Sequence, residues 1–266
     1  MNYRTILAVV NEQSASTVAA RYALALAQTG RGRLVLYSAT AEGADESRLR
    51  LVDRHLDHLF NEAGELGVMV TRISETGRLS QLLPHRVTAE GVELVCYPVP
   101  PGEHYGDPLQ QQEMHRLLRT VRADLAVFRI MQMGRPHPRR ILVPLGVSTG
   151  DRERRSAFLA ALAHCFHSQI TLFHRAGRRG EAVPDDFAAI RNDLRQRHLS
   201  VLERVSSGNI AHDIALEAVS HHHDLIVLGA SQRGLLRRLL AGNPAGDVMH
   251  HPPCNAVIFR AGPPRP

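Results

Sequence analysis

The chain contains no tryptophan and no lysine, and it has only three cysteines among its 266 residues. Cys96, Cys165 and Cys254 are widely spaced and lie in apolar runs, so neither a disulfide framework nor a zinc cluster is indicated. We expect all three to be buried thiols. The longest apolar runs are far shorter than the roughly 20 residues needed to cross a bilayer, and the N-terminus lacks a signal-peptide pattern. These absences predict a cytoplasmic protein.

Because lysine is absent, arginine carries the positive charge of the chain. Residues 1–138 contain 15 arginines and 15 acidic residues, whereas residues 139–266 contain 17 and 11, so the net charge of +6 lies entirely in the second half. A surplus of this size could attract a polyanion, but nucleic-acid binding usually adds a basic stripe with stacking aromatics. The few Phe and Tyr residues are spread over the whole chain. We therefore expect no nucleic-acid partner.

The first half alternates short apolar strands with helical patterns, which is the signature of a parallel sheet. The predicted strands are Thr5–Val10, Leu34–Ala39, Val68–Ile73, Val92–Pro98 and Asp124–Ile130. The predicted helices run from Ser14 or Ser16 to Gln28, stopping at Gly30, and over Asp45–Leu66, Leu79–Ala89 and Gln110–Val121. Four residues at helical spacing form the apolar face of the second helix: Leu49, Val52, Leu56 and Leu59.

The same order of elements recurs after the Pro/Gly-rich linker at residues 133–138. The predicted strands are Arg139–Leu145, Ile170–His174, Leu199–Val205, Leu225–Leu228 and a closing strand that ends at Phe259. The predicted helices are Asp151–Phe166, Pro184–Gln196, Ile210–His221 and one that starts at Pro244. This internal repeat predicts two domains, residues 1–132 and 139–266, each with a five-stranded parallel sheet flanked by helices.

The stretch from Asp224 to Arg260 carries the strongest sign of a binding site. Its buried strand ends at Gly229, where a missing Cβ permits an unusual backbone conformation and the close approach of a ligand. Gly242 and Asn243 then precede a proline, the pattern of a flexible turn, an N-cap and a first helical residue. Arg233 lies in the intervening segment. A helix N-terminus close to arginine predicts an anion site.

The spacing of this stretch resembles Gly-x-x-Gly-x9-Gly-Ser/Thr, the nucleotide-binding signature of the universal stress protein family. Gly229 matches the first glycine of the signature and Gly242 the third. Gln232 replaces the second glycine, and Asn243 replaces the Ser or Thr while keeping a hydrogen-bond donor. The closing segment, residues 251–259, is similar to the last strand of the family.

The resemblance implies two tandem Rossmann-like domains of the adenine nucleotide alpha hydrolase-like type, covering nearly the whole chain. It also implies that the second domain holds an adenine nucleotide such as ATP. Its phosphates would lie at Gly229, Arg233, Gly242 and Asn243, and the first strand of that domain adds two further candidate residues, Pro144 and Gly146.

Two features of the second half depart from nucleotide-binding members of the family. Leu145-Gly146 stands where such members commonly carry Val-Asp, so no carboxylate is offered to the ribose or adenine. Arg175 stands where a small apolar residue normally frames adenine. Either change could redirect the site to a different anion or leave it without a ligand.

The first half lacks the signature altogether. Residues 98–108 contain four prolines, which cannot donate N–H groups to a phosphate, and two acidic residues that would repel one. We therefore expect at most one nucleotide per chain, with the first half as the structural partner of the second.

Three functions remain open. The first is a non-catalytic regulatory module that binds an adenine nucleotide in its second domain. The second is an interaction scaffold with a decayed site, which uses sheet edges or helices to dimerise or to dock on a membrane transporter. The third is a slow nucleotide hydrolase, for which no motif positions a general base or a metal-binding carboxylate. The resemblance further implies that the two halves pair through their fifth strands as a pseudo-dimer.

No metal or catalytic residue is predicted. His221, His222 and His223 look like a metal tract, but neighbouring side chains at a helix end point in different directions, and a cationic or capping role there is more usual. No Gly-x-Ser-x-Gly or comparable nucleophile setting accompanies the 16 histidines.

Overall fold

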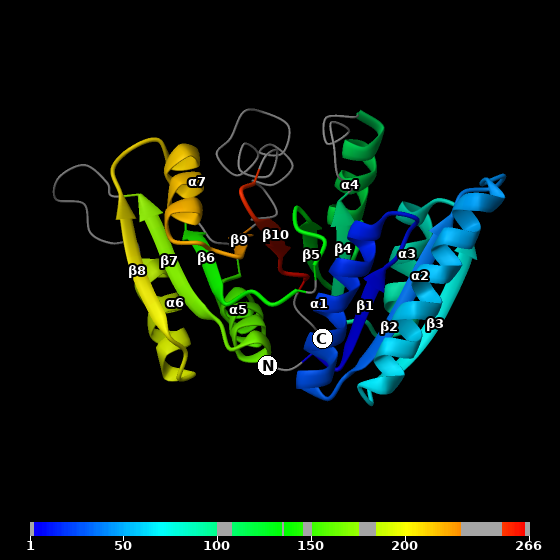
Figure 1. Ribbon diagram of the computed structural model, residues 1–266, viewed down its shortest axis with the longest axis horizontal. Coiled ribbons are helices and arrows are strands. Elements are labelled where there is room, and N and C mark those ends of the chain that lie inside the picture. The colour runs from blue at the N-terminus through cyan, green and yellow to red at the C-terminus, as the bar shows by residue number, and fades with distance from the viewer. Residues whose placement is uncertain are drawn as a thin grey trace. The chain divides into compact units, whose positions relative to one another are not determined.

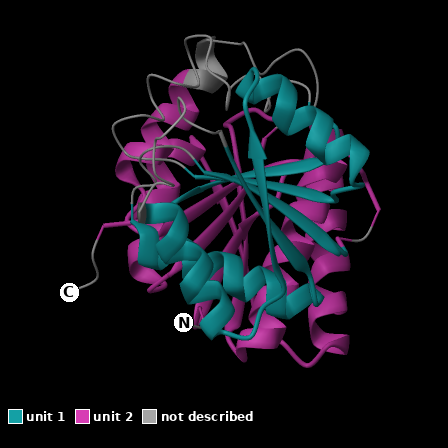
Figure 2. Cartoon of the chain, turned by 90° about the vertical axis from the view of Figure 1, so that its left-hand side faces the viewer, with its two compact units in different colours: residues 1, 137–261 teal, residues 2–136, 262–266 magenta. Residues whose placement is uncertain are grey.

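The computed structural model describes residues 3–99, 108–134, 136–145, 151–175, 185–229 and 252–263. The chain divides into two compact units, which Figure 2 draws in different colours. Unit 2 comprises residues 2–136 and 262–266, and unit 1 comprises residue 1 and residues 137–261. The C-terminal end of the chain therefore returns to the unit formed by the N-terminal half.

Unit 2 is built on five parallel strands in the order β3-β2-β1-β4-β5 (Figure 1). The strands are β1 (Thr5–Val9), β2 (Arg33–Thr40), β3 (Met69–Thr76), β4 (Leu94–Val99) and β5 (Asp124–Arg129). The helices are α1 (Ser14–Gly30), α2 (Glu46–Glu65), α3 (Leu79–Ala89) and α4 (Pro108–Thr120). Helix α1 packs against α2, and α3 packs against α4, so the helices cover the sheet in two pairs.

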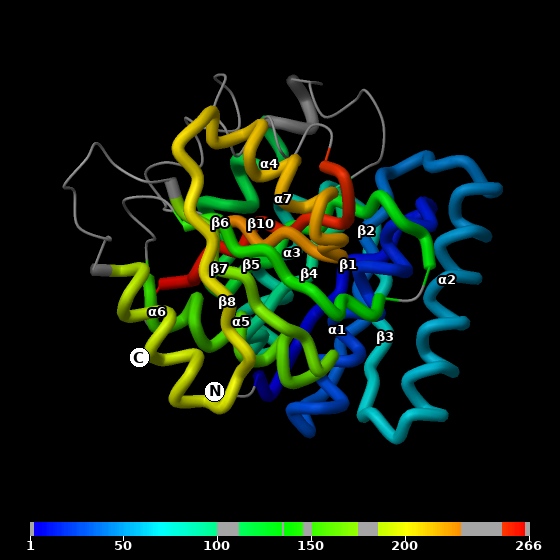
Figure 3. Tube along the Cα trace, turned by 60° about the vertical axis from the view of Figure 1, so that its left-hand side comes forward, coloured from blue at the N-terminus to red at the C-terminus, as the bar shows by residue number. Residues whose placement is uncertain are grey.

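Unit 1 repeats this architecture with the strand order β10-β9-β6-β7-β8. Its strands are β6 (Arg140–Leu145), β7 (Gln169–Arg175), β8 (Val201–Ser206), β9 (Leu225–Gly229) and β10 (Asn255–Arg260). Its helices are α5 (Arg152–Phe166), α6 (Asp185–Gln196) and α7 (Ile210–Ser220). Figure 3 follows this backbone through β6, β7 and β8 in green to yellow.

The predicted α/β fold, with five parallel strands flanked by helices in each unit, is confirmed. The helix expected to start at Pro244 lies outside the described residues. No helix in the described part of the chain is both long enough and apolar enough to cross a membrane.

Two smaller expectations were wrong. Leu49 is 37% exposed, because the buried face of α2 consists of Val52, Leu56, Leu59 and Ala63 and begins one turn later than expected. Cys165 is only half-buried near the end of α5, whereas the thiols of Cys96 and Cys254 are buried and free. Burial raises the pKa of the Cys254 thiol to about 12, so this sulfur stays protonated at neutral pH.

The outermost strands β3 and β8 are tied to the helices beside them by ion pairs. Arg72 of β3 contacts the carboxylates of Asp53 and Asp57 on α2. Glu203 of β8 contacts Arg191 at 3.3 Å and Arg195 at 2.8 Å, both on α6. These strands are largely exposed, so ion pairs rather than apolar contacts hold much of their outer surface to the helices.

The turn between α1 and β2 depends on a close backbone contact. Arg31 follows α1 in the left-handed conformation, with φ of 52°. Gly32 comes next, and a Cβ there would lie 2.5 Å from the carbonyl oxygen of Tyr3 and 2.9 Å from that of Arg4. Only glycine therefore lets β2 begin directly beside the segment that leads into β1.

We expect Gly32→Ala to destabilise unit 2 by about 1–3 kcal/mol, because the methyl group would meet backbone atoms that cannot move aside. Gly64→Ala is the matched control, since a Cβ at Gly64 in α2 has nothing within 4 Å. Alanine in a helix interior should leave stability unchanged or raise it by up to about 1 kcal/mol. Urea unfolding followed by circular dichroism measures both variants, and equal midpoints for the two would contradict the prediction.

Candidate functional site

Strands β6 and β9 lie side by side in unit 1 and run in the same direction. Ile141 pairs with Leu225, and Leu142 pairs with Ile226. The strands end at Leu145 and Gly229, so their carboxyl ends meet at one edge of the sheet. Ligands of open α/β sheets bind outside this edge. The structure thus places two of the predicted site residues, Pro144 and Gly229, at neighbouring strand ends.

The other four predicted site residues, Gly146, Arg233, Gly242 and Asn243, lie outside the described residues, as does Gln232. Among the described residues, the site therefore consists of the two strand ends and the helix that follows β6.

Gly229 has a different local role from the one expected. Its φ is not positive, because it is the last residue of β9 and pairs with Phe259 of β10 in extended conformation. A Cβ at Gly229 would instead lie 2.5 Å from Cζ and 2.9 Å from Nε of Arg155. The missing side chain thus makes room for a guanidinium group of the protein itself.

Arg155 brings a buried positive charge to these strand ends. It lies in the first turn of α5 with 2% of its surface exposed, and its Nη2 donates a hydrogen bond to the carbonyl oxygen of Pro144 at 3.0 Å. Its Nε is buried and has no hydrogen-bond partner among the residues that the structure describes. Burial lowers the pKa of Arg155 to about 10, an effect that the charge of Asp186 partly opposes. The guanidinium therefore remains charged at neutral pH.

The charged residues near Arg155, at the start of α5 and on α6, have partners of their own. The carboxylate of Asp151 caps the helix by accepting a hydrogen bond from the backbone N of Arg154 at 3.0 Å. Arg152 is exposed and contacts Asp186 of α6 at 3.6 Å. The nearest carboxylates are thus engaged elsewhere, and Arg155 forms no ion pair within the part of the chain that the structure describes.

Sequence reasoning missed Arg155, although its position contains a signal. Phe158, Leu159 and Leu162 follow it at spacings of three, four and seven residues, and all three are fully buried. Arg155 therefore occupies the core-facing stripe of α5. An arginine in such a stripe, just after the strand that leads to the expected site, indicates a buried cation there.

The histidine tract after α7 is also arranged differently from the expectation. His222 adopts a left-handed conformation with φ of 49°, which turns the chain so that His221 and His223 both face Glu217. Nδ1 of His221 lies 3.2 Å and Nε2 of His223 lies 3.6 Å from Oε1 of Glu217. Arg204 of β8 approaches the same oxygen at 3.6 Å. Within the described residues no three His, Cys, Asp or Glu side chains are placed to hold a metal ion.

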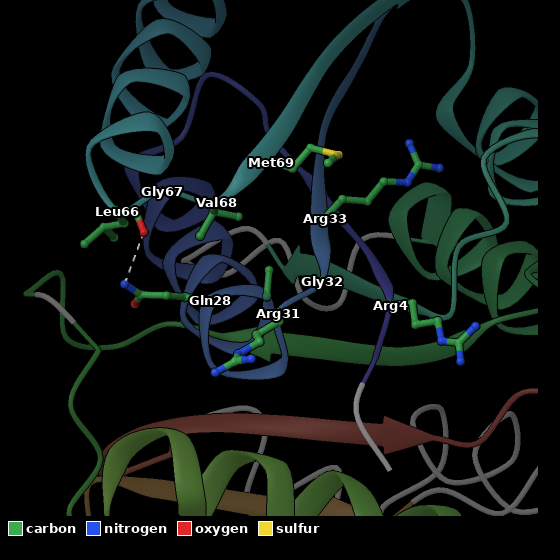
Figure 4. Close-up of a pocket in the computed structure, with 10 residues that line it drawn as sticks. Arg4, Gln28, Arg31, Gly32, Arg33, Leu66, Gly67, Val68 and Met69 are labelled. Carbon is green, nitrogen blue, oxygen red and sulfur yellow. Dashed lines mark hydrogen bonds between the residues drawn. The ribbon is translucent and has the colours of Figure 1, made fainter.

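Unit 2 contains a separate cavity of about 490 Å³ at the amino ends of β1, β2 and β3. Arg4 and Arg31 lie on either side of Gly32 there, beside the apolar side chains of Val68 and Met69 (Figure 4). The side chain of Gln28 donates to the carbonyl oxygen of Leu66 at its rim. This cavity lies at the edge opposite the one where open α/β sheets bind ligands, so it is a weaker candidate.

Comparison with known proteins places both units in one structural class. Residues 138–260 match the model of the universal stress protein family. A universal stress protein from Archaeoglobus fulgidus DSM 4304 has a similar structure, with a TM-score of 0.71 at 12% identity over 99% of this chain and 98% of that chain. A putative universal stress protein from Pseudomonas aeruginosa UCBPP-PA14 gives 0.62 at 20% identity, over 96% and 92%.

The fold likeness extends beyond that family. The cytoplasmic domain of a prokaryotic cation chloride cotransporter gives a TM-score of 0.59 at 12% identity, over 98% of this chain and 96% of that chain. No curated protein matches the sequence. The likenesses that span the whole chain show that both halves share the fold.

We expect the stability of unit 1 to fall as the pH drops below about 6.5, because His223 must be protonated in the unfolded chain but not in the folded one. Burial lowers the pKa of His223 from 6.5, and the charges of His221 and Arg140 act in the same direction, while Glu217 opposes them. A lowered histidine pKa means that the unfolded state binds more protons, so acid favours unfolding, by at most about 1.4 kcal/mol per pH unit for one group.

Urea unfolding between pH 7.5 and 5 tests this prediction in the wild type and in His223→Gln, whose stability should depend less on pH. His85→Gln is the control, since His85 is exposed on α3. Equal pH dependence in the wild type and His223→Gln would show that His223 is not responsible.

Proposed function

Because residues 138–260 form a universal stress protein domain, we propose that this chain is a non-catalytic regulatory protein that binds an adenine nucleotide, such as ATP, in unit 1. The observation that carries the proposal is the edge formed by β6 and β9, where Pro144 and Gly229 lie beside a buried guanidinium. A phosphate chain needs positive charge, and the guanidinium supplies it at this edge.

The proposed binding mode uses the carboxyl edge of unit 1, with the phosphates toward β9 and the nucleoside over β6 and β7. Pro144 and Gly229 form part of this edge in the described residues. From the motif spacing, Arg233, Gly242, Asn243 and Gly146 are proposed as further ligand-binding residues. The proposal involves no metal ion, because the residues of the site are proposed to bind the phosphates directly.

A regulatory role fits this chain better than turnover does. The described side chains at the edge include an arginine that is charged at neutral pH and no carboxylate placed as a general base. Hydrolysis of a nucleotide would require an activated water, and no described side chain at this edge is placed to activate one. Occupancy by the nucleotide, rather than its conversion, would then be the signal.

The second candidate function is an interaction scaffold. The likeness to the cytoplasmic domain of a cation chloride cotransporter favours it, because that domain has a similar fold along nearly its whole length. In this alternative the chain docks on a membrane transporter or forms a homodimer, and the edge of unit 1 holds no nucleotide.

We expect calorimetric titration of the full chain with ATP to give saturable heat with at most one site per chain. Unit 1 supplies that site, and residues 98–108 of unit 2 lack the motif. ATP at 100 times its Kd should stabilise the folded chain by about 2.7 kcal/mol. Adenosine, which lacks phosphates, should bind much more weakly.

Gly242→Val is the variant for this experiment, because a β-branched side chain in the motif would block the approach of phosphate. Gly64→Val in α2 is the control, since it introduces the same side chain in unit 2, outside the motif. No heat with ATP, ADP or AMP for the wild type, or equal heats for the wild type and Gly242→Val, would remove the nucleotide proposal and leave the scaffold.

A further inference from the structure

Arg155 holds a charge for which the described part of unit 1 provides no counter-charge in contact. It is 2% exposed, its one hydrogen bond there runs from Nη2 to the carbonyl oxygen of Pro144, and Nε is buried without a partner. An isolated buried charge is costly, and buried arginines are normally paired with carboxylates or other acceptors. An oxyanion bound at these strand ends would supply such an acceptor.

The geometry around the guanidinium selects an oxyanion. The group lies between the last residues of two parallel strands, with the Pro144 carbonyl on one side and the side-chain-free Gly229 on the other. A guanidinium has five N–H donors in one plane, and its fork matches the oxygens of a phosphate or carboxylate. Among the described residues, only the bond from Nη2 to Pro144 engages these donors.

The charges in the first turn of α5 also favour the binding of an anion. The N-terminus of this 15-residue helix carries a partial positive charge, which favours an anion. Arg154 adds further positive charge in the same turn, whereas Glu153 is exposed and Asp151 is engaged as the cap. Asp186 contacts Arg152 rather than Arg155.

We propose that Arg155 is the anion-recognition residue of unit 1, binding a phosphate group at the carboxyl ends of β6 and β9. Gly229 is glycine so that the guanidinium fits beside β9, a second role in addition to any contact with the ligand. This inference rests on the proposed function in one respect, namely that the bound phosphate belongs to a nucleotide. Inorganic phosphate and the phosphate of a nucleotide present the same chemistry to Arg155.

Unit 2 has no equivalent of Arg155. The first turn of α1, which follows β1 as α5 follows β6, reads Ser-Ala-Ser-Thr. Its Ser16 is buried, and the Ser16 hydroxyl donates to the carbonyl oxygen of Gln13 at 2.7 Å, so this helix start carries a neutral hydroxyl and no buried cation. The anion site is therefore specific to unit 1.

The test is thermal unfolding of the full chain at increasing inorganic phosphate, with sodium chloride adjusted to constant ionic strength. The wild type should be stabilised in a saturable way. Arg155→Met should need at least about tenfold more phosphate for the same rise in Tm, because a hydrogen-bonded charged contact is lost. Arg155→Lys keeps the charge without the fork and should lie between the two.

The control is Arg152→Met, which removes one exposed positive charge from the same turn and should respond to phosphate like the wild type. Without phosphate, Arg155→Met should be at least as stable as the wild type, because it removes a buried charge without a partner. A purely structural arginine would give the reverse result, a less stable variant with an unchanged phosphate response.

A parallel titration with ATP separates the two proposals. If phosphate stabilises the wild type through Arg155 and ATP is no better than phosphate, the anion site stands and the nucleotide function fails. If ATP binds the wild type and Arg155→Met equally well, the nucleotide function stands and the role of Arg155 is overturned. A wild type that responds to neither phosphate nor ATP also overturns it.

Discussion

The parallel pairing of β6 with β9 is the constraint on which the chemistry of unit 1 depends. It brings the ends of two strands that are 84 residues apart in sequence to the same edge, at Leu145 and Gly229. Helix α5 follows β6 and runs back along the sheet, so its first turn must lie at that edge too. An arginine in this turn, on the buried face of the helix, therefore reaches both strand ends at once.

Much of the fold could be predicted from the sequence, because short apolar runs separated by helical patterns specify a parallel sheet with little ambiguity. The repeat of that order then indicated two similar sheets. Depth of burial was harder to predict. The spacing of Leu49 places it on the apolar stripe of α2, but the buried face of that helix begins only at Val52.

The site was less accessible to sequence reasoning. Gly229 was identified from its place after a buried strand, but the reason for a glycine there lies in a side chain 74 residues away, which no local pattern contains. The histidine tract gives a second example. Its side chains converge on Glu217 only because His222 takes a left-handed conformation that is uncommon for a residue other than glycine.

The charged outer strands β3 and β8 restrict how this chain can meet other proteins. A peptide that joined either sheet as an additional strand would need a flat, uncharged border, and it would meet arginine and glutamate side chains already fastened to α2, α3 and α6. The charged side chains on these edge strands thus disfavour the addition of another strand and the aggregation that would follow. A partner protein would find its contacts on helix surfaces or loops, where recognition depends on side chains rather than on backbone hydrogen bonds.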